Sequence, residues 1–191
     1  PPMPEGSAPD ILKGMYLFQS GITRKKAPKV HLLGSGTIFC EVLEAATLLR
    51  DDWGVESDLF SCTSFTELAR DGQSCERWNR LHPTAKARKS HVEKCIPKSD
   101  IPVIAATDYI RAFAEQVRPY ISAPYTVLGT DGFGRSDTRA LLRSFFEVDR
   151  YHVVIAALKS LADKGEFEAA KIDVAIAKYN IDPEAVAPWL I

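Results

Sequence analysis

The sequence lacks the patterns that would mark a secreted or membrane protein. It has only four cysteines (Cys40, Cys62, Cys75 and Cys95), and none of them form a Cys-x-x-Cys pair. In a chain of this size, such spacing favours reduced, mostly buried thiols in a cytoplasmic protein. No apolar run approaches the roughly 18 uncharged residues that a membrane span needs. The start, PPMPEGSAPD, lacks the basic-then-apolar pattern of a signal peptide.

The sequence also lacks an excess of either charge. Twenty-four Lys and Arg residues against 25 Asp and Glu residues give a formal net charge of -1. Nucleic-acid-binding proteins usually carry an excess of positive charge, and this sequence has none overall. We therefore expect neither a nucleic-acid nor a membrane partner. Two basic clusters, 24–26 and 86–89, are expected to be solvated loops.

The 191 residues are enough to bury a sizeable core. Residues 1–10 are rich in proline and do not begin with methionine, so we expect a linker from a preceding domain. Residues 11–191 are expected to form a single α/β domain. Five apolar runs are strand candidates, and they lie at 11–18, 29–36, 56–64, 101–108 and 125–131.

Helical patterns separate these runs. The residues at 37–53, 64–82, 109–121 and 137–146 have helical character, as does much of the chain after Asp149. Alternating strands and helices predict a three-layer fold, in which helices flank a mostly parallel, five-stranded sheet.

Local signals refine the helix boundaries. Ser64 and Glu67 fit a capping box at the start of one helix. Asp182-Pro183-Glu184 has the cap, proline and acid that favour another helix start. The polar segment 84–100 is expected to be a loop.

The turn "LLGSGTIF" invites comparison with a dinucleotide site. Such a site would have a third glycine where this chain has Phe39, although Glu56 or Asp58 could supply the acid. A tight turn that uses glycine's backbone freedom is the favoured interpretation, and a nucleotide-binding enzyme is the alternative.

Metal and nucleophile patterns are weak. Cys75, His82, His91 and Cys95 are candidate zinc ligands, but only the last two approach the close spacing of structural sites. We therefore interpret them as buried thiols and surface histidines, and expect no metal site. No Gly-x-Ser-x-Gly elbow or cysteine signature is present, so we assign no catalytic residue.

Acidic side chains gather near the predicted strand ends. Asp108, Asp131 and Asp137 follow or lie close to strand candidates, where open parallel sheets bind ligands. Capping of helix starts explains the same residues, and both interpretations stay open.

Three long stretches carry a family resemblance. "TSFTELARDGQSCERWNRLHP", "TDYIRAFAEQVRPYI" and "VLGTDGFGRSDTRALLRSFFEVD" resemble the C-terminal part of the homodimeric pyruvate dehydrogenase decarboxylating component. The likeness extends to "ILKGMY" near the start and "AIAKYNID" near the end. "FGRS" also resembles the Phe-Gly-x-Ser of transketolase C-terminal domains.

The resemblance implies a thiamine-dependent parent enzyme that decarboxylates pyruvate and acetylates a lipoyl group. Thiamine diphosphate and magnesium would be held by the earlier domains of a homodimer, which works with a dihydrolipoyl acyltransferase core. The family's Gly-Asp-Gly and Asn-Asn motif has no match in this sequence. This domain is therefore expected to bind neither cofactor.

In that context "GTDGFGRSD" is expected to be a joint to neighbouring domains. Phe133 and Arg135 have the residue types of interface anchors. Ser136 or Asp137 is expected to cap the helix that follows. The alternative is a regulatory or docking module that binds a small anion or a partner protein at the edge formed by Asp108, Asp131 and Arg135.

Overall fold

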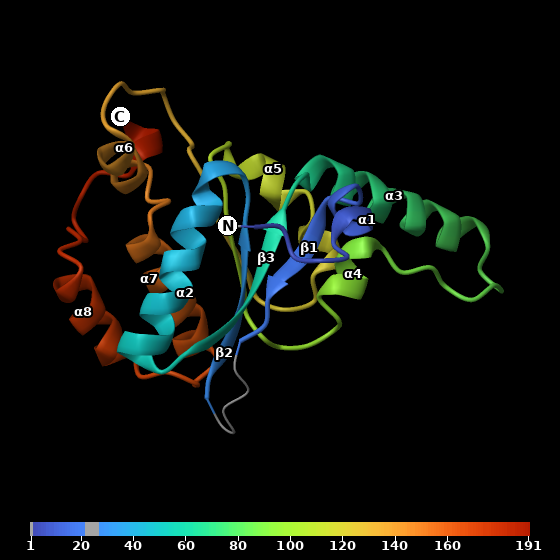
Figure 1. The fold of residues 1–191 in the computed structure, drawn as a ribbon, viewed down its shortest axis with the longest axis horizontal. Coiled ribbons are helices and arrows are strands. Elements are labelled where there is room, and N and C mark those ends of the chain that lie inside the picture. The colour runs from blue at the N-terminus through green and yellow to red at the C-terminus, as the bar shows by residue number, and fades with distance from the viewer. Residues whose placement is uncertain (1, 22–26) are drawn as a thin grey trace.

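The protein is built around a five-stranded sheet in the order β1-β3-β2-β4-β5 (Figure 1). The computed structural model describes residues 2–21 and 27–191, so the basic cluster 24–26 lies outside the described residues. All neighbouring strands are parallel except β1, which pairs antiparallel with β3 at one edge. The predicted mostly parallel sheet is confirmed. Its strands are β1 (Met15–Gln19), β2 (Lys29–Gly34), β3 (Glu56–Cys62), β4 (Val103–Ala106) and β5 (Tyr125–Leu128).

Helices cover both faces of the sheet, which gives the three layers expected from the sequence. On one face lie α2 (Phe39–Trp53), α7 (Arg150–Asp163) and α8 (Ala169–Lys178) (Figure 1). On the other lie α3 (Phe65–Leu81), α4 (His91–Cys95) and α5 (Arg111–Glu115). Helix α6 (Arg139–Phe145) lies near the C-terminus, and α1 (Ala8–Ile11) lies beside β1.

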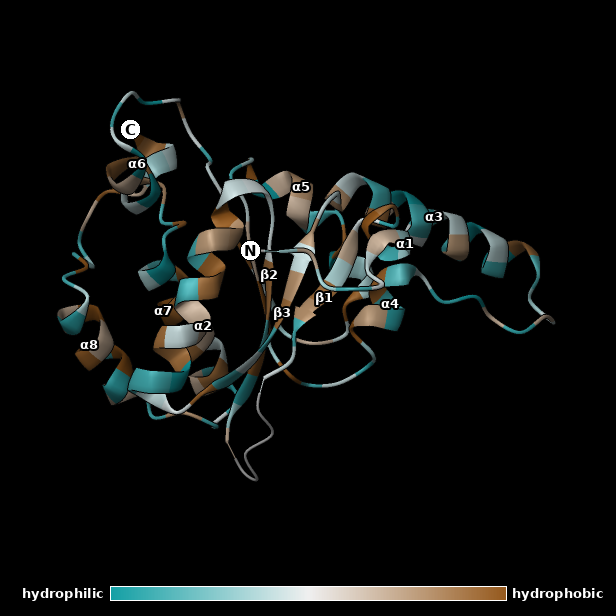
Figure 2. Ribbon diagram, viewed as in Figure 1, coloured by the Kyte–Doolittle hydropathy of each residue, from teal (hydrophilic) through white to brown (hydrophobic). Residues whose placement is uncertain are grey.

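Burial explains the strand composition. All four residues of β4 are buried, as are five of the six in β2, because these central strands have helices on both faces. The apolar side chains form one cluster under α2 and α7 and a second under α3 and α5. Figure 2 shows the hydrophobic ribbon segments gathered in the strands and on the helices beside them.

Two short helices, α1 and α4, were not predicted. The segment 84–100 contains α4, so its interpretation as a loop throughout is wrong. Ser90 and Glu93 form a complete capping box, in which Ser90 Oγ accepts from Glu93 N at 3.3 Å and Glu93 Oε2 accepts from Ser90 N at 2.7 Å. This exchange satisfies two backbone donors, which stabilises a helix that propensity alone would not favour.

The predicted helix start at Asp182 is also wrong. Asp182 Oδ1 accepts from Glu184 N at 2.9 Å, which closes a turn, and a 3-10 turn over Pro188–Leu190 follows. An aspartate bonded two residues ahead stabilises a turn as well as it caps a helix.

The capping box predicted at Ser64 is half formed. Ser64 Oγ accepts from Glu67 N at 3.1 Å, but Ser64 N donates to the Gly14 carbonyl instead of to Glu67. At the N-terminus, α1 crosses the boundary expected between residues 10 and 11. That boundary stays a prediction.

Candidate functional site

The carboxyl ends of β2 and β4 mark the point where the connections of the sheet diverge. After β2 the chain passes through α2 to β3, whereas after β4 it passes through α5 to β5 on the opposite side. Open α/β sheets bind ligands at such a point. Here the base of the crevice is closed, because Ser35 Oγ donates to Thr107 Oγ1 at 2.8 Å and both residues are buried.

Asp108 lies at this edge, as expected. Gly36 has φ +54°, and a Cβ added to it would lie 2.7 Å from both carboxylate oxygens of Asp108. The carboxylate therefore rests against the 3-10 turn that leads into α2, where the helix dipole favours negative charge. Glycine is required in the "GSG" turn for this contact and for its positive φ.

The first glycine of that turn has a packing role. A Cβ on Gly34 would lie 2.9 Å from Phe39 Cα, so the first turn of α2 rests directly on the end of β2. Phe39 turns its ring edge-on toward Phe18, with 5.1 Å between the ring centroids. Helix α2 and strand β2 therefore pack closely although Phe39 stands at the position where a dinucleotide fingerprint has glycine.

Asp131 braces two loops together. Its carboxylate accepts from the backbone N of Arg111 at 3.2 Å and forms an ion pair with the Arg111 side chain. Thr130 adds two bonds of 2.9 Å, one from its N to the Tyr109 carbonyl and one from its Oγ1 to the Asp108 carbonyl. The loop after β5 is thereby fixed to the loop after β4.

The next residue, Gly132, contacts the C-terminal turn. Its φ is +106°, and an added Cβ would lie 2.6 Å from the Pro188 carbonyl oxygen. The Arg111 guanidinium lies 4.7 Å from the ring centroid of Trp189. "TDG" therefore offers no open cradle for a diphosphate, and the carboxylate of Asp131 is already paired with Arg111. These residues do not fit a thiamine diphosphate and magnesium site.

The remaining predicted residues lie on an exposed segment. Phe133 is 81% exposed, and the guanidinium of Arg135 lies 5.2 Å from the Phe145 ring. Neither Ser136 nor Asp137 caps the helix that follows, which corrects the expectation. Thr138 holds the position before Arg139, and its Oγ1 accepts from Leu141 N at 3.4 Å. Asp137 accepts from the backbone N of Thr138 at 2.7 Å.

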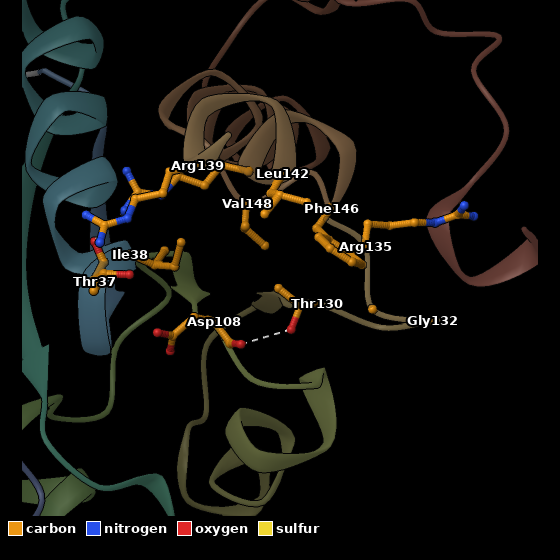
Figure 3. Close-up of a pocket in the computed structure, with 12 residues that line it drawn as sticks. Thr37, Ile38, Asp108, Thr130, Gly132, Arg135, Arg139, Leu142, Phe146 and Val148 are labelled. Atoms are coloured by element: carbon orange, nitrogen blue, oxygen red, sulfur yellow. Dashed lines mark hydrogen bonds between the residues drawn. The ribbon is translucent and has the colours of Figure 1, made fainter. Parts of the chain in front are cut away.

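A cavity of about 350 Å³ opens between these loops and α6 (Figure 3). Its apolar residues are Ile38, Leu142, Phe146 and Val148, and Ile38 and Val148 are almost fully buried. Its polar residues are Thr37, Asp108, Thr130, Arg135, Arg139 and Arg143. Asp108 and Arg135 both line the cavity, but the guanidinium of Arg135 points away from it (Figure 3). Asp131, Phe133, Ser136 and Asp137 do not line it.

A buried carboxylate that the sequence reasoning did not single out holds α6 in place. Glu41, on α2, accepts from Arg143 Nη1 at 2.6 Å and from Arg150 Nε at 2.8 Å. It also accepts from the backbone N of Arg150 at 3.1 Å. This cluster joins α2 to the end of α6 and to the start of α7, and so fixes one wall of the cavity.

The candidate zinc ligands do not converge on one point. Their interpretation as buried thiols and surface histidines is wrong in part, because His91 is buried and Cys75 and Cys95 are only half-buried. His91 Nε2 donates to the Met15 carbonyl at 2.8 Å and lies 3.4 Å from Cys95 Sγ. His82 stacks on Trp78, with 4.4 Å between the ring centroids. Burial raises the pKa of the Cys95 thiol to about 11, which disfavours the thiolate that binds zinc. Across residues 2–21 and 27–191, no three His, Cys, Asp or Glu side chains are grouped to hold a metal ion.

In the part of the chain that the structure describes, no helix combines the length and apolarity needed to cross a membrane.

The fold defines a class of protein. Transketolase structures superpose on most of this chain. One of them is a split gene transketolase described as an inactive β4 tetramer, with a TM-score of 0.52 at 19% identity. The match covers 84% of this chain and 47% of the transketolase chain. A transketolase from Pichia stipitis, in complex with xylulose 5-phosphate, gives a TM-score of 0.58 at 15% identity, over 88% of this chain and 21% of the other. At these identities the likeness shows a shared fold: this chain has the architecture of a transketolase C-terminal domain.

The sequence comparison then gives the family. Residues 14–149 match the family described as Transketolase-like TK C-terminal domain, and the chain belongs to it. The whole chain is 61% identical to a region of the pyruvate dehydrogenase E1 component of Cupriavidus necator, and 53% identical to that of Escherichia coli K12. That region is the C-terminal part of those proteins. The chain spans 21% of the length of each.

Proposed function

We propose that this chain is the C-terminal domain of a pyruvate dehydrogenase E1 component, in which it packs domains and subunits together and carries out no chemistry itself. The observation that carries the proposal is 61% identity to an E1 component along all 191 residues. Identity at this level over all 191 residues is far above the 19% and 15% of the two transketolase structures that share the fold.

The side chains at the carboxyl edge support a packing role. Asp131 is committed to Arg111, Thr130 is committed to neighbouring carbonyls, and Gly132 holds the C-terminal turn. The exposed Phe133, beside Arg135, is the kind of anchor that association with another surface would bury. An exposed aromatic residue directly after the braced residues 130–132 supports a joint between domains.

The remaining parts of the proposal come from the family resemblance. The parent chain uses thiamine diphosphate and magnesium, held by domains other than this one, to decarboxylate pyruvate and acetylate a lipoyl group. Its partners are the preceding domains, the second subunit of a homodimer and the dihydrolipoyl acyltransferase core, and its location is the cytoplasm.

A domain exchange tests the proposal. The C-terminal region of the Cupriavidus necator E1 component is replaced by this chain, and pyruvate-dependent acetylation of a lipoyl domain is measured. Because the two sequences are 61% identical over this region, we expect the chimera to assemble and to retain activity within several-fold of the unmodified enzyme.

Two controls make the exchange decisive. A truncated E1 component without the region should lose assembly or activity. A chimera that carries a transketolase C-terminal domain instead tests whether the shared fold alone is sufficient. If the chimera with this chain is as inactive as the truncated enzyme, the proposal is wrong. Equal activity of both chimeras would show that the E1-specific residues are not needed.

A further inference from the structure

The cavity beside α6 has a chemistry that a packing role does not require. We propose that it binds a small organic anion with an apolar body, such as an aryl or alkyl carboxylate. Its volume of about 350 Å³ lies at the lower end of the range for small-molecule sites, about 300–1,000 Å³. The proposal does not rest on the identity of the parent enzyme.

One cation at the rim is available to a ligand. Among residues 2–21 and 27–191, no hydrogen bond or ion pair engages the guanidinium of Arg139. Figure 3 shows its side chain extending from α6 over the side of the cavity where Thr37 and Ile38 lie. A guanidinium can donate two parallel hydrogen bonds to a carboxylate, which gives both affinity and orientation.

Neither of the other two arginines that line the cavity directs a free guanidinium into it. Arg143 is committed to Glu41, at 2.6 Å, and approaches the Thr37 carbonyl. Arg135 points away from the cavity in Figure 3 and lies over the Phe145 ring. Arg139 is therefore the cation that the ligand would contact.

The single acid at the rim does not cancel that charge. The carboxylate of Asp108 rests against Gly36 at the start of the turn into α2. The N-terminal end of the turn into α2 offsets part of its negative charge. Glu41 lies behind Arg143 and Arg150, which neutralise it. A ligand anion would thus meet the unpaired positive charge of Arg139, opposed in part by the carboxylate of Asp108.

The floor of the cavity explains the need for an apolar body. Leu142 and Phe146 are half-buried, and they meet the nearly fully buried Ile38 and Val148. An inorganic anion would leave these side chains facing water. A ring or short alkyl chain would cover them, and each CH₂ group removed from water strengthens binding. Thr37 and Thr130 add hydroxyl groups at the rim.

Binding is measured with the full-length protein that contains this chain. Phenylacetate is the probe, phenylacetamide is its neutral analogue, and saturation-transfer NMR and calorimetry report binding. We expect saturable binding of phenylacetate that is weakened about tenfold in Arg139→Gln, because one charge-assisted contact is lost. Arg139→Lys should recover only part of the affinity, because lysine restores the charge but not the paired hydrogen bonds. Leu142→Ser should weaken the binding of both probes.

Matched variants locate the site. Arg80→Gln, on α3, removes an exposed arginine that lies 3.9 Å from Glu76 and does not line the cavity, and it should leave binding unchanged. Asp108→Asn should strengthen phenylacetate binding by removing a like charge. The proposal is overturned if phenylacetate does not saturate, if Arg139→Gln binds as well as wild type, or if phenylacetamide binds equally. Tighter binding of phenylalanine that is lost in Asp108→Asn would show a zwitterion site instead.

Discussion

Replacing Glu41 by glutamine should destabilise the domain more than any exposed charge change on the same helix. Glu41 is buried and accepts from Arg143 and from both the side chain and the backbone of Arg150. Glutamine keeps the shape of the side chain but removes the negative charge. Two guanidinium groups are then left without their shared counter-ion.

The expected loss is about 3 kcal/mol in the free energy of unfolding. Removing one partner of a buried ion pair costs about 3–5 kcal/mol. The lower value applies because the Arg143 and Arg150 side chains are 20% and 34% exposed, so water partly solvates them. For a domain of this length, each kcal/mol lowers the melting temperature by about 2–4 °C.

The effect should depend on pH. Burial opposes ionisation of Glu41, but the hydrogen bonds and charge of Arg150, together with the charge of Arg143, outweigh it. They hold the pKa of the carboxyl below its usual value. Since this pKa is lowered in the folded state, the stabilisation is present above the unfolded pKa and lost as pH falls through the folded pKa. The difference in free energy of unfolding between Glu41→Gln and wild type should therefore shrink below about pH 4.

Urea unfolding of the 191-residue chain, followed by circular dichroism at pH 7 and pH 3.5, measures the difference. Glu44→Gln is the control. Glu44 is on the same helix and lies 3.3 Å from Arg150 Nη1, but its side chain is 55% exposed, so its loss should cost less than about 1 kcal/mol. If Glu41→Gln costs no more than Glu44→Gln, the reasoning about this cluster is wrong.

Three further outcomes are expected. Gly132→Ala should lower the free energy of unfolding by about 1 kcal/mol or more, because Gly132 has a positive φ and contacts Pro188. Gly134→Ala should be neutral or slightly stabilising in thermal unfolding, because an added Cβ there meets nothing within 4 Å. Equal losses in the two variants would contradict this. A thiol reagent at pH 8 should modify the exposed Cys40 first, since burial raises the pKa of both Cys62 and Cys95, and Cys40→Ser should abolish the fast phase. Calorimetry of the isolated chain with thiamine diphosphate and magnesium should show no saturable heat, and micromolar binding would refute the assignment of the cofactor to other domains.

The sequence was sufficient to predict the sheet because its strands are short, apolar and separated by helical patterns. β4 is the clearest case, since a fully buried parallel strand has no polar face that could obscure the pattern. Helix α4 was missed although Ser90 and Glu93 have the spacing of a capping box. The helix has only five residues and lies between polar segments, and the surrounding composition is typical of a loop.

The site was less predictable because its contacts are remote in sequence. Asp108 and Arg135 could be placed at the edge from the order of strands. No local pattern pairs Glu41 with Arg143 and Arg150, which lie more than 100 residues away along the chain. The contact between Gly132 and Pro188 also joins residues that are remote in sequence, because it depends on how the C-terminal turn packs against the loop after β5.

The central claim is that this domain is a joint and not a catalyst, and the loop at Phe133 tests it most directly. Phe133 and Arg135 are both replaced by alanine in the full-length E1 component. Assembly is measured by sedimentation, and turnover is measured per assembled dimer. We expect weaker association, because buried aromatic and arginine anchors can each contribute about 2 kcal/mol, with turnover per dimer unchanged. In the isolated chain, the double substitution should change the free energy of unfolding by no more than about 0.5 kcal/mol, since Phe133 is 81% exposed. Unchanged assembly with a fall in turnover per dimer would contradict the account.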